Sequence, residues 1–529
     1  MTRVVGARVE DRRSAEVDGA VRAWLAEYGA ETADVGHLLC DRHHPDGVAF
    51  VHVDSDLSST ILTYGELADS SRRLATVLAA RGVTTGTCVP VLMGKRRELV
   101  ITLLALWRLG AVHVPLFTAF AAGAIRLRVE GAEAGLVVTE PSQRSKLDEI
   151  DGITILAFDE ELESLIAVTE PLTDRHPVGG DGTMMLLFTS GTTGKPKGVA
   201  VPVRALAAFH AYMRFGLDVS EEDVFWNAAD PGWAYGLYYG VVGPLLIGRP
   251  NLLLATGFTP ESTVAVMRRF GVTNFAGAPT MYRALSKSGV VRGVSLRRAS
   301  SAGEPLTPDV VAWARTGLDT EIRDHYGQTE LGMVINNHWH DSLARPVRPG
   351  SMGSPMPGYT AGIVDGQIAV EVATSPLLWF TGYHRSERSL ERFSSDGSWY
   401  LTADTGYVDD EGYFYFTARD DDVILAAGYR IGPFEVEGVL SGHPDVAEVA
   451  VVGRSDPEGI RGEVVEAFVV LVAGIEPTAA LAEELQQVVR DQYSKHAYPR
   501  TVHFVGSLPR TPSGKVQRFK LREQGTDEP

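Results

Sequence analysis

A stretch rich in glycine, hydroxyl side chains and lysine is the most chemically informative part of this sequence. Residues 186–199 read LLFTSGTTGKPKGV. Glycines let a backbone turn tightly and approach a ligand closely. Backbone amides, hydroxyls and lysines that follow an apolar strand are suited to bind an oxyanion such as a triphosphate, with a solvated turn as the alternative. The Walker spacing GxxxxGK[ST] is not met here. The candidate phosphate-binding residues are Thr189, Ser190, Gly191, Thr192, Thr193, Gly194 and Lys195.

Residues 189–199, TSGTTGKPKGV, closely resemble the signature of the adenylate-forming enzymes. This superfamily comprises acyl-CoA synthetases, peptide-synthetase adenylation domains and luciferases. The resemblance continues in motif order from about Ala33 to the C-terminus, and its motifs are most similar to those of acetyl- and medium-chain acyl-CoA synthetases. It implies a reaction in two steps. A carboxylate attacks the α-phosphate of Mg·ATP, which gives an acyl-adenylate and pyrophosphate, and a thiol then displaces AMP.

Two segments in the middle of the chain resemble the adenine- and magnesium-binding motifs of this superfamily. Residues 299–307 read ASSAGEPLT and residues 324–330 read DHYGQTE. The resemblance implies that Tyr326 stacks on adenine and that Glu330 binds Mg²⁺ through an oxygen ligand, which a hard cation prefers. The residues assigned to the nucleotide in these segments are Gly303, Glu304, Pro305, Asp324, His325, Tyr326, Gly327, Gln328 and Thr329; Thr329 and Glu330 are also assigned to catalysis.

A third segment, YLTADTGY at 400–407, resembles the ribose-binding motif. Asp404 is expected to accept hydrogen bonds from both ribose hydroxyls, and Arg419 to reach the same sugar. Ala403 stands where the family usually has glycine. Asp421 aligns with the hinge about which the C-terminal domain of relatives swings between the two half-reactions.

The C-terminal part carries three further expectations from the resemblance. Gly428 is expected beside the pantetheine arm of CoA, and Arg430 is expected to contact phosphate groups. Lys515, in PRTPSGK at 509–515, resembles the lysine that stabilises charge in the adenylation step only. This string also resembles a context for acetylation, so we expect that a lysine acetyltransferase acting on Lys515 would remove the charge and stop the first step.

The acyl pocket is predicted from residues 230–240, DPGWAYGLYYG, which resemble the acyl-binding segment of acyl-CoA synthetases. The expected lining residues are Trp233, Ala234, Tyr235, Gly236, Ala302 and Gly327, with Tyr238 and Tyr239 interpreted as core. Acetyl-CoA synthetases carry a tryptophan at the position of Gly327. We therefore expect a carboxylic acid larger than acetate, either medium-chain or aromatic.

Helices that alternate with short apolar runs must position these motifs, a rhythm typical of α/β proteins. We expect helices over 15–28, 67–80 and 98–109, a strand over 89–93, a turn into a buried strand within 110–116, and a strand over 184–188 just before the glycine-rich stretch. Three carboxylates at 420–422 mark a boundary, followed by a compact pattern of strands and helices. The prediction is an α/β protein with a large N-terminal domain of parallel-rich sheets flanked by helices (1–419) and a small mobile α/β C-terminal domain (420–529).

Composition excludes several classes of function. The 529 residues include 49 Lys and Arg against 67 Asp and Glu, a net charge of −18, which argues against a broad nucleic-acid surface. Two cysteines, Cys40 and Cys88, form neither a disulfide framework nor a cysteine-rich metal site. The apolar stretch 99–117 is interrupted by Arg108, and the N-terminus lacks a signal core. We expect a cytoplasmic protein without an integral membrane span.

The leading hypothesis is an acyl-CoA synthetase that uses ATP and Mg²⁺ and takes coenzyme A as a co-substrate. The main alternative is a stand-alone adenylating enzyme that passes the acyl group to a carrier protein, an amine or another nucleophile, because both share the first step. A remote alternative is a non-catalytic nucleotide sensor. Retention of Glu330, Arg430 and Lys515 disfavours that reading.

Overall fold

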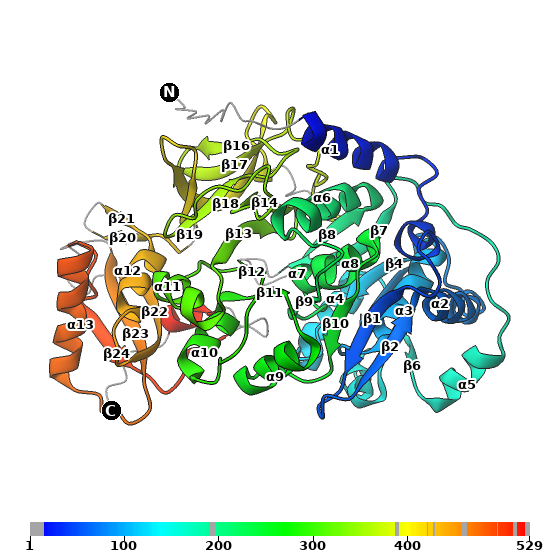
Figure 1. Ribbon diagram of the computed structural model, residues 1–529, viewed down its shortest axis with the longest axis horizontal. Helices are drawn as coiled ribbons and strands as arrows, with labels where there is room; N and C mark the ends of the chain where they lie inside the picture. Colours follow the sequence, from blue (N-terminus) through cyan, green and yellow to red (C-terminus); the bar gives the residue numbers. More distant parts are fainter. Residues whose placement is uncertain are drawn as a thin grey trace.

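The computed structural model describes residues 15–189, 196–386, 391–419, 422–426, 429–455, 463–494, 496–510 and 516–523. A large body is built on two sheets, and a small unit made from the C-terminal part lies beside it (Figure 1). This arrangement confirms the predicted α/β class, with a large sheet-rich N-terminal part and a small C-terminal part that has its own sheet.

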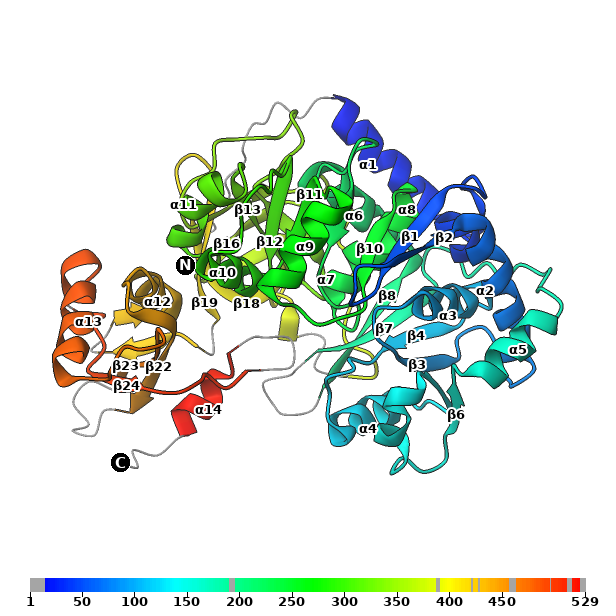
Figure 2. The same ribbon diagram turned by 60° about the horizontal axis from the view of Figure 1, so that its bottom comes forward.

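One of the two sheets in the large body has six strands. Across the sheet they are β6 (Thr154–Ala157), β5 (Leu136–Thr139), β3 (Cys88–Leu92), β4 (Val112–Pro115), β7 (Thr183–Thr189) and β8 (Lys197–Pro202). All neighbours are parallel except β7 and β8, which form an antiparallel hairpin. Helices α2 (Tyr64–Ala79) and α3 (Arg97–Arg108) cover one face and α4 (Ala122–Gly131) the other (Figure 2). Both faces are covered, as a mostly parallel sheet requires.

The second sheet has thirteen strands and two halves. Its parallel half contains β1 (Val48–Val53), β10 (Asn251–Leu254), β9 (Phe225–Asn227), β11 (Asn274–Gly277), β12 (Arg298–Ala302) and β13 (Ile322–Gln328), with β2 (Ser59–Thr63) antiparallel at the edge. The antiparallel half continues with β14 (Gly332–Asn336), β15 (Ser351–Pro355), β19 (Phe414–Arg419), β18 (Trp399–Val408), β17 (Gln367–Glu371) and β16 (Ala361–Val364). The halves meet at β13 and β14, where the candidate nucleotide residues lie.

The predicted elements form within a few residues of their expected bounds. Helix α1 (Ala15–Tyr28) buries Val17, Val21 and Tyr28, the face that its 3.6-residue period predicts. Helix α3 is buried along almost its whole length, and Arg108 at its end pairs with Asp41 at 2.7 Å. A charge inside the core is stable there because it is paired and hydrogen-bonded.

The remaining elements of the large body are short helical segments. The α-helices are α5 (Glu160–Val168), α6 (Leu206–Ala211), α7 (Ala234–Gly236), α8 (Gly243–Ile247), α9 (Pro260–Phe270), α10 (Pro279–Ser288) and α11 (Pro308–Gly317). Three further segments, η1 (His37–Asp41), η4 (Tyr212–Gly216) and η5 (Leu237–Val242), are π-helical, and η2 (Pro141–Leu147) and η3 (Val203–Ala205) are 3₁₀ turns. Segments η4 and η5 continue α6 and α7, so two helices change their winding next to β13.

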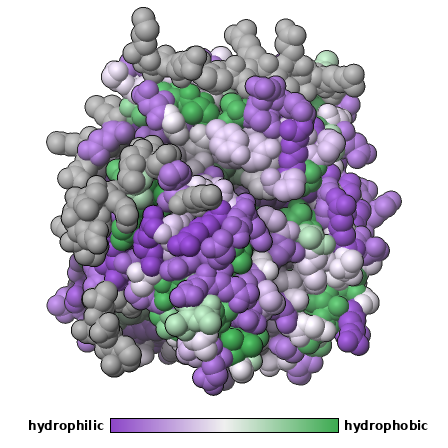
Figure 3. Space-filling view, turned by 90° about the vertical axis from the view of Figure 1, so that its left-hand side faces the viewer, coloured by the Kyte–Doolittle hydropathy of each residue, from purple (hydrophilic) through white to green (hydrophobic). Residues whose placement is uncertain are grey.

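The small C-terminal unit has a core of its own. It contains β20 (Ile424–Ala426), β21 (Tyr429–Ile431), α12 (Pro433–Ser441), β22 (Val446–Ser455), β23 (Glu463–Leu471), α13 (Ala479–Gln492), β24 (Thr501–Phe504) and α14 (Arg518–Glu523). Apolar side chains of α12 and α13 pack on the sheet β22–β23–β24. The face of the molecule on this side is largely hydrophilic, with small scattered hydrophobic groups (Figure 3).

Candidate active site

The glycine-rich stretch joins two paired strands. Thr189 ends β7 and Lys197 begins β8, and the two residues are partners in the antiparallel register. The Thr189 hydroxyl donates to the Lys197 carbonyl at 3.4 Å. Residues Ser190, Gly191, Thr192, Thr193, Gly194 and Lys195 lie between them and outside the described residues. The predicted strand before the glycine-rich stretch is therefore confirmed. The contacts of the six residues that follow it stay a prediction.

Three residues assigned to the nucleotide meet in one hydrogen-bonded cluster. The Tyr326 hydroxyl donates to Oδ2 of Asp404 at 2.6 Å, and Nε2 of Gln328 donates to the same oxygen at 2.7 Å. Nε of Arg419 lies 4.0 Å from the other oxygen, Oδ1. Burial and the neighbouring Asp404 charge raise the pKa of Tyr326 well above its usual value, so the phenol stays a donor. Strands β13, β18 and β19 thus gather residues from three distant parts of the sequence around one carboxylate.

The Glu330 carboxylate is held by residues that no sequence motif identified. The Tyr383 hydroxyl donates to Oε1 of Glu330 at 2.8 Å and accepts from Nε of Arg392 at 3.0 Å. Nη1 of Arg392 also donates to the Thr402 carbonyl at 3.0 Å, and the Lys197 ammonium lies 5.1 Å from the centre of the Tyr383 ring. Tyr383 and Arg392 lie in a segment without hydrophobic periodicity, so only the three-dimensional contacts reveal their place.

The residues around Glu330 fit a magnesium ion that arrives with a nucleotide. Within the ranges that the structure describes, no group of three His, Cys, Asp or Glu side chains could hold a metal ion. Mg²⁺ keeps several waters and is usually held by one or two carboxylates together with substrate phosphates, so it needs no cage made of protein alone. Glu330 is a buried carboxylate at the end of the nucleotide segment and can supply such a ligand.

The segment after β12 turns sharply. Gly303 has a φ of +104°, a conformation that glycine adopts without strain. Glu304 pairs with Arg283 of α10 at 2.9 Å. Oδ2 of Asp324 accepts from the Leu306 amide at 3.3 Å, which ties this segment to β13. Burial raises the pKa of Asp324 to about 8, and its Oδ1 is buried with no hydrogen-bond partner among the described residues.

Four aromatic residues from the predicted acyl segment have different surroundings. Trp233 packs against Phe117 and Phe120, with ring centres 5.4 Å apart in both pairs. Tyr235 is half-buried, and its hydroxyl lies 3.0 Å from the Tyr212 hydroxyl. Tyr238 and Tyr239 are fully buried among core residues, which confirms that interpretation of them. Trp233, Ala234 and Tyr235 remain partly accessible, so they border open space.

Position 327 requires a different explanation from the one that its sequence suggests. Gly327 lies at an irregularity of the β13–β14 pairing, and a Cβ atom there would lie 2.1 Å from the Gly332 carbonyl oxygen. No side chain fits unless the backbone shifts. The missing side chain is a requirement of the strand pairing in this chain, and the effect of Gly327 on the width of the acyl pocket stays a prediction.

The hydrogen-bond partners of His325 lie outside the cluster of Tyr326, Gln328 and Asp404. Its ring is buried, with Nδ1 2.7 Å from the Tyr212 hydroxyl and Nε2 3.1 Å from the Asn337 carbonyl oxygen. Three further residues that the sequence assigned to the nucleotide or the acyl group have backbone or packing contacts. The Thr329 carbonyl accepts from the Tyr238 hydroxyl at 3.1 Å, Gly236 is packed against the Asp230 carbonyl, and Ala302 is buried at the end of β12.

Several C-terminal candidates fall outside what the structure describes. Asp421, Gly428 and Lys515 are not described, and of Arg430 only the backbone is, paired with Leu425 between β20 and β21. The backbone on both sides of residues 511–515 is held, because Arg510 and Val516 form an antiparallel bridge. Asp422 pairs with Arg522 and, at 3.6 Å, with Arg518, which connects the start of the small unit to α14.

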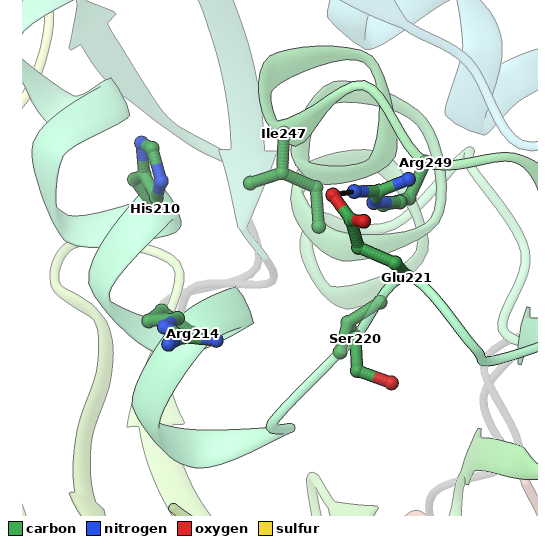
Figure 4. Close-up of a pocket in the computed structure, with 7 residues that line it drawn as sticks. His210, Arg214, Ser220, Glu221, Ile247 and Arg249 are labelled. Atoms are coloured by element: carbon green, nitrogen blue, oxygen red, sulfur yellow. Dashed lines mark hydrogen bonds and ion pairs between the residues drawn. The ribbon is translucent and has the colours of Figure 1, made fainter.

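A hollow of about 270 Å³ lies away from these clusters. Glu221 and Arg249 form an ion pair at its edge, and His210, Arg214 and Ile247 line it (Figure 4). Trp24 stacks on His210 with ring centres 4.1 Å apart. The hollow contains none of the residues that the sequence motifs selected.

Comparison with known proteins decides the family. The model of the AMP-binding enzyme family matches residues 40–375, and the model of the AMP-binding enzyme C-terminal domain matches residues 435–515. The chain belongs to the AMP-binding enzyme family. It is an AMP-forming acid–CoA ligase of the acyl-CoA synthetase group, with ATP, Mg²⁺ and CoA as its cofactor and co-substrates.

Relatives in this family are similar over most of their length. The acetyl-coenzyme A synthetase of Bacillus subtilis is 36% identical over 497 residues, which cover 87% of this chain and 84% of that protein. The human mitochondrial acyl-coenzyme A synthetase ACSM3 is 34% identical over 518 residues, which cover 91% of this chain and 86% of that protein. The crystal structure of a Brucella canis acyl-CoA synthetase matches with a TM-score of 0.73 at 43% identity and covers 96% of both chains.

The structure also bears on the membrane. Among the helices that the structure describes, none is both long enough and apolar enough to cross a bilayer.

Proposed function

We propose that this AMP-binding enzyme activates a carboxylic acid larger than acetate, medium-chain or aromatic, and transfers the acyl group from the adenylate to CoA. The observation that carries the proposal is the cluster of Tyr326, Gln328 and Asp404, with Glu330 held by Tyr383 directly after it. An aromatic ring, a doubly contacted carboxylate and a second carboxylate for a cation form a suitable set for a purine nucleoside with phosphates.

Roles follow for the individual residues of this site. Asp404 and Arg419 bind the ribose, Tyr326 and Gln328 the adenine, and the segment 189–195 the phosphates. Glu330 would hold Mg²⁺, which offsets phosphate charge and orients the leaving pyrophosphate. Thr329 positions the α-phosphate. The hydrogen bond from Tyr383 fixes one Glu330 oxygen, and the acceptor capacity that remains is available to a ligand.

The small unit supplies the second set of roles. We assign the boundary to residues 419 and 420 and the hinge to Asp421, because the two family models end at 375 and begin at 435 on either side of it. Lys515 stabilises the adenylation transition state, Arg430 contacts phosphate, and Gly428 leaves room for the thiol arm of CoA. An acetyltransferase that modifies Lys515 would remove a positive charge and stop adenylation. Protein acetylated at Lys515 in vitro and assayed for pyrophosphate release tests this role, and unchanged release would contradict it.

The size of the acid is supported by the acyl segment. Ala234 and Tyr235 are partly accessible although they pack against the main buried core, and Trp233 is partly accessible although it packs on Phe117 and Phe120. Accessible aromatic surface at this segment favours an apolar acyl group of several carbons, because covering it removes apolar area from water.

Pyrophosphate release with a panel of acids, each with and without CoA, tests the function. We expect release that turns over only with CoA and that is faster with medium-chain or aromatic acids than with acetate. The highest kcat/KM with acetate would contradict the proposed size of the acid. Acid-dependent pyrophosphate release without stimulation by CoA would contradict the acceptor and favour a carrier protein or an amine.

A further inference from the structure

A chain of hydrogen bonds runs from the predicted acyl pocket into the core. The hydroxyl oxygens of Tyr235 and Tyr212 are 3.0 Å apart, and the Tyr212 hydroxyl is 2.7 Å from Nδ1 of His325. On the far side of the ring, Nε2 of His325 is 3.1 Å from the Asn337 carbonyl oxygen. Three side chains from α7, η4 and β13 are thereby connected in a line that ends on the backbone.

The protonation of His325 and its carbonyl partner determine which group donates in each of these hydrogen bonds. Burial lowers the pKa of His325 to about 3, so its ring is neutral and carries one N–H. A carbonyl oxygen only accepts, so Nε2 holds that hydrogen and Nδ1 is an acceptor. Tyr212 must then donate to Nδ1. Its single proton is used there, and Tyr235 must donate to the Tyr212 oxygen.

Of the three hydrogen-bonded side chains, only that of Tyr235 belongs to a partly exposed residue. Tyr212 and His325 are buried, at 0% and 2% exposure, whereas Tyr235 is partly exposed. Among the described residues, Tyr212 is the only hydrogen-bond partner of the Tyr235 hydroxyl. The Tyr235 hydroxyl therefore has lone pairs free to accept a hydrogen bond and no proton to donate.

Both tyrosines stand where helical winding changes. Tyr212 begins the π-helical segment η4, and Tyr235 lies in the short helix α7 directly before η5. Extra residues in a helical turn re-aim side chains and occur often at functional sites. The aromatic packing of Tyr235 against Tyr239, with ring centres 5.5 Å apart, further limits its rotation.

We propose that Tyr235 is a specificity-determining residue that only accepts hydrogen bonds, and that the acid used by this enzyme carries a hydroxyl group at the carbon facing it. The inference rests on the proposed function, because it places the acyl chain beside α7. An unsubstituted acid leaves the Tyr235 oxygen without its partner. A keto acid brings two acceptors together, which is worse, because a site built for a hydroxyl rejects analogues that cannot donate.

Matched acids on the wild-type enzyme provide the first test. The set is hexanoate with its 3-, 4- and 5-hydroxy and oxo derivatives, and benzoate with its hydroxylated derivatives. The readout is kcat/KM for pyrophosphate release. We expect one hydroxy acid to exceed its parent by about tenfold or more, and the matching oxo acid to be the poorest of the three.

Two substitutions separate the role of Tyr235 from general packing. Tyr235→Phe keeps the ring and removes the acceptor, so the preference for the hydroxy acid over its parent should fall to about one. Tyr212→Phe removes the acceptor of the Tyr235 proton, which frees that proton for the ligand and should shift the preference from the hydroxy toward the oxo acid. Tyr239→Phe deletes a hydroxyl in the same aromatic cluster outside the chain, and it should leave the ratio unchanged.

A binding measurement distinguishes failure of this inference from failure of the proposed function. The probes are hexanoyl- and hydroxyhexanoyl-sulfamoyl adenosine, stable analogues of the adenylate, titrated by calorimetry against wild-type and Tyr235→Phe protein. We expect tighter binding of the hydroxylated analogue to the wild type only. Equal binding of both analogues, or a preference that survives in Tyr235→Phe, overturns the inference and leaves the proposed function standing. No binding of either analogue and no acid-dependent pyrophosphate release overturn both.

Discussion

The Tyr383 hydroxyl and the Glu330 carboxylate form a 2.8 Å hydrogen bond, and Arg392 donates to the same hydroxyl from the other side at 3.0 Å. This contact decides where one oxygen of Glu330 points. Such a hydrogen-bond partner orients a carboxylate that would bind a metal ion. Removal of the partner typically lowers metal affinity or activity by roughly 10–100-fold.

Tyr383→Phe therefore should weaken the response to Mg²⁺. We expect the Mg²⁺ concentration for half-maximal pyrophosphate release to rise by about tenfold or more. The measurement is a titration of Mg²⁺ at saturating ATP and acid. Tyr407→Phe, an exposed tyrosine stacked on Tyr415, is the matched control and should titrate like the wild type. An unchanged midpoint in Tyr383→Phe would show that Glu330 needs no orientation.

Asp404→Asn should reduce the use of ATP. The two donors on Oδ2, Tyr326 and Gln328, would lose a charged acceptor, and the ribose would lose it as well. Hydrogen bonds to charged groups contribute about 1.5–3 kcal/mol each, so kcat/KM for ATP should fall by about 100-fold. Steady-state kinetics with varied ATP measures it. The KM for the acid should change little, and a selective rise of that KM would contradict the assignment.

Ala403→Gly is expected to stabilise the protein. Ala403 has a φ of +59°, where the family usually has glycine, and this left-handed conformation costs a residue with a side chain about 1–2 kcal/mol. Glycine avoids that cost and adds about 0.5–1 kcal/mol of unfolded-state entropy, so the net gain is about 0.5–1 kcal/mol. Urea unfolding measures the change. Ala200→Gly, in the middle of strand β8, is the control and should destabilise; a loss of stability in both variants would refute the prediction.

Asp324 predicts how stability depends on pH. Burial raises its pKa to about 8, from the usual value near 4 in an unfolded chain. Between these values the folded state holds the proton more tightly, so the stability that this group contributes is present at low pH and lost as pH rises toward and through 8. Asp324→Asn should remove this decline. Unfolding free energies of both proteins at pH 5 and pH 8 test it, and a wild-type protein that gains stability relative to Asp324→Asn over this range would contradict it.

Lys287 connects the two parts of the molecule. Its Nζ on α10 donates to the Val446 carbonyl at 3.0 Å and also to the Ala447 carbonyl, both in β22 of the small unit. Lys287→Met keeps the apolar stem and removes both contacts, so the small unit should sample other orientations. Small-angle X-ray scattering should show a larger radius of gyration, whereas Lys520→Met on α14 should not; identical curves would mean that other contacts set the orientation.

Much of the fold could be predicted from local residue patterns. The periods of α1, α2 and α3 and the apolar runs of β3, β4 and β7 indicated elements that form within a few residues of their expected bounds. Such patterns suffice because the burial of one face is recorded in consecutive residues. The motif at 189–199 and the segment 324–330 likewise pointed to a nucleotide site, since the residues of each motif are neighbours in sequence.

The contacts that shape the site depend on residues far apart in the chain. Tyr383 and Arg392 reach Glu330 only because the segment between β17 and β18 returns to the end of β13. The glycine at position 327 suggested a wide acyl pocket. A side chain there would collide with the Gly332 carbonyl oxygen on the neighbouring strand, which sequence alone does not show. The polarity of Tyr235 follows from Tyr212 in η4, His325 in β13 and Asn337 directly after β14. Local sequence can indicate which residues are able to donate or accept, and long-range packing decides which partner uses each proton and which atom remains free for a substrate.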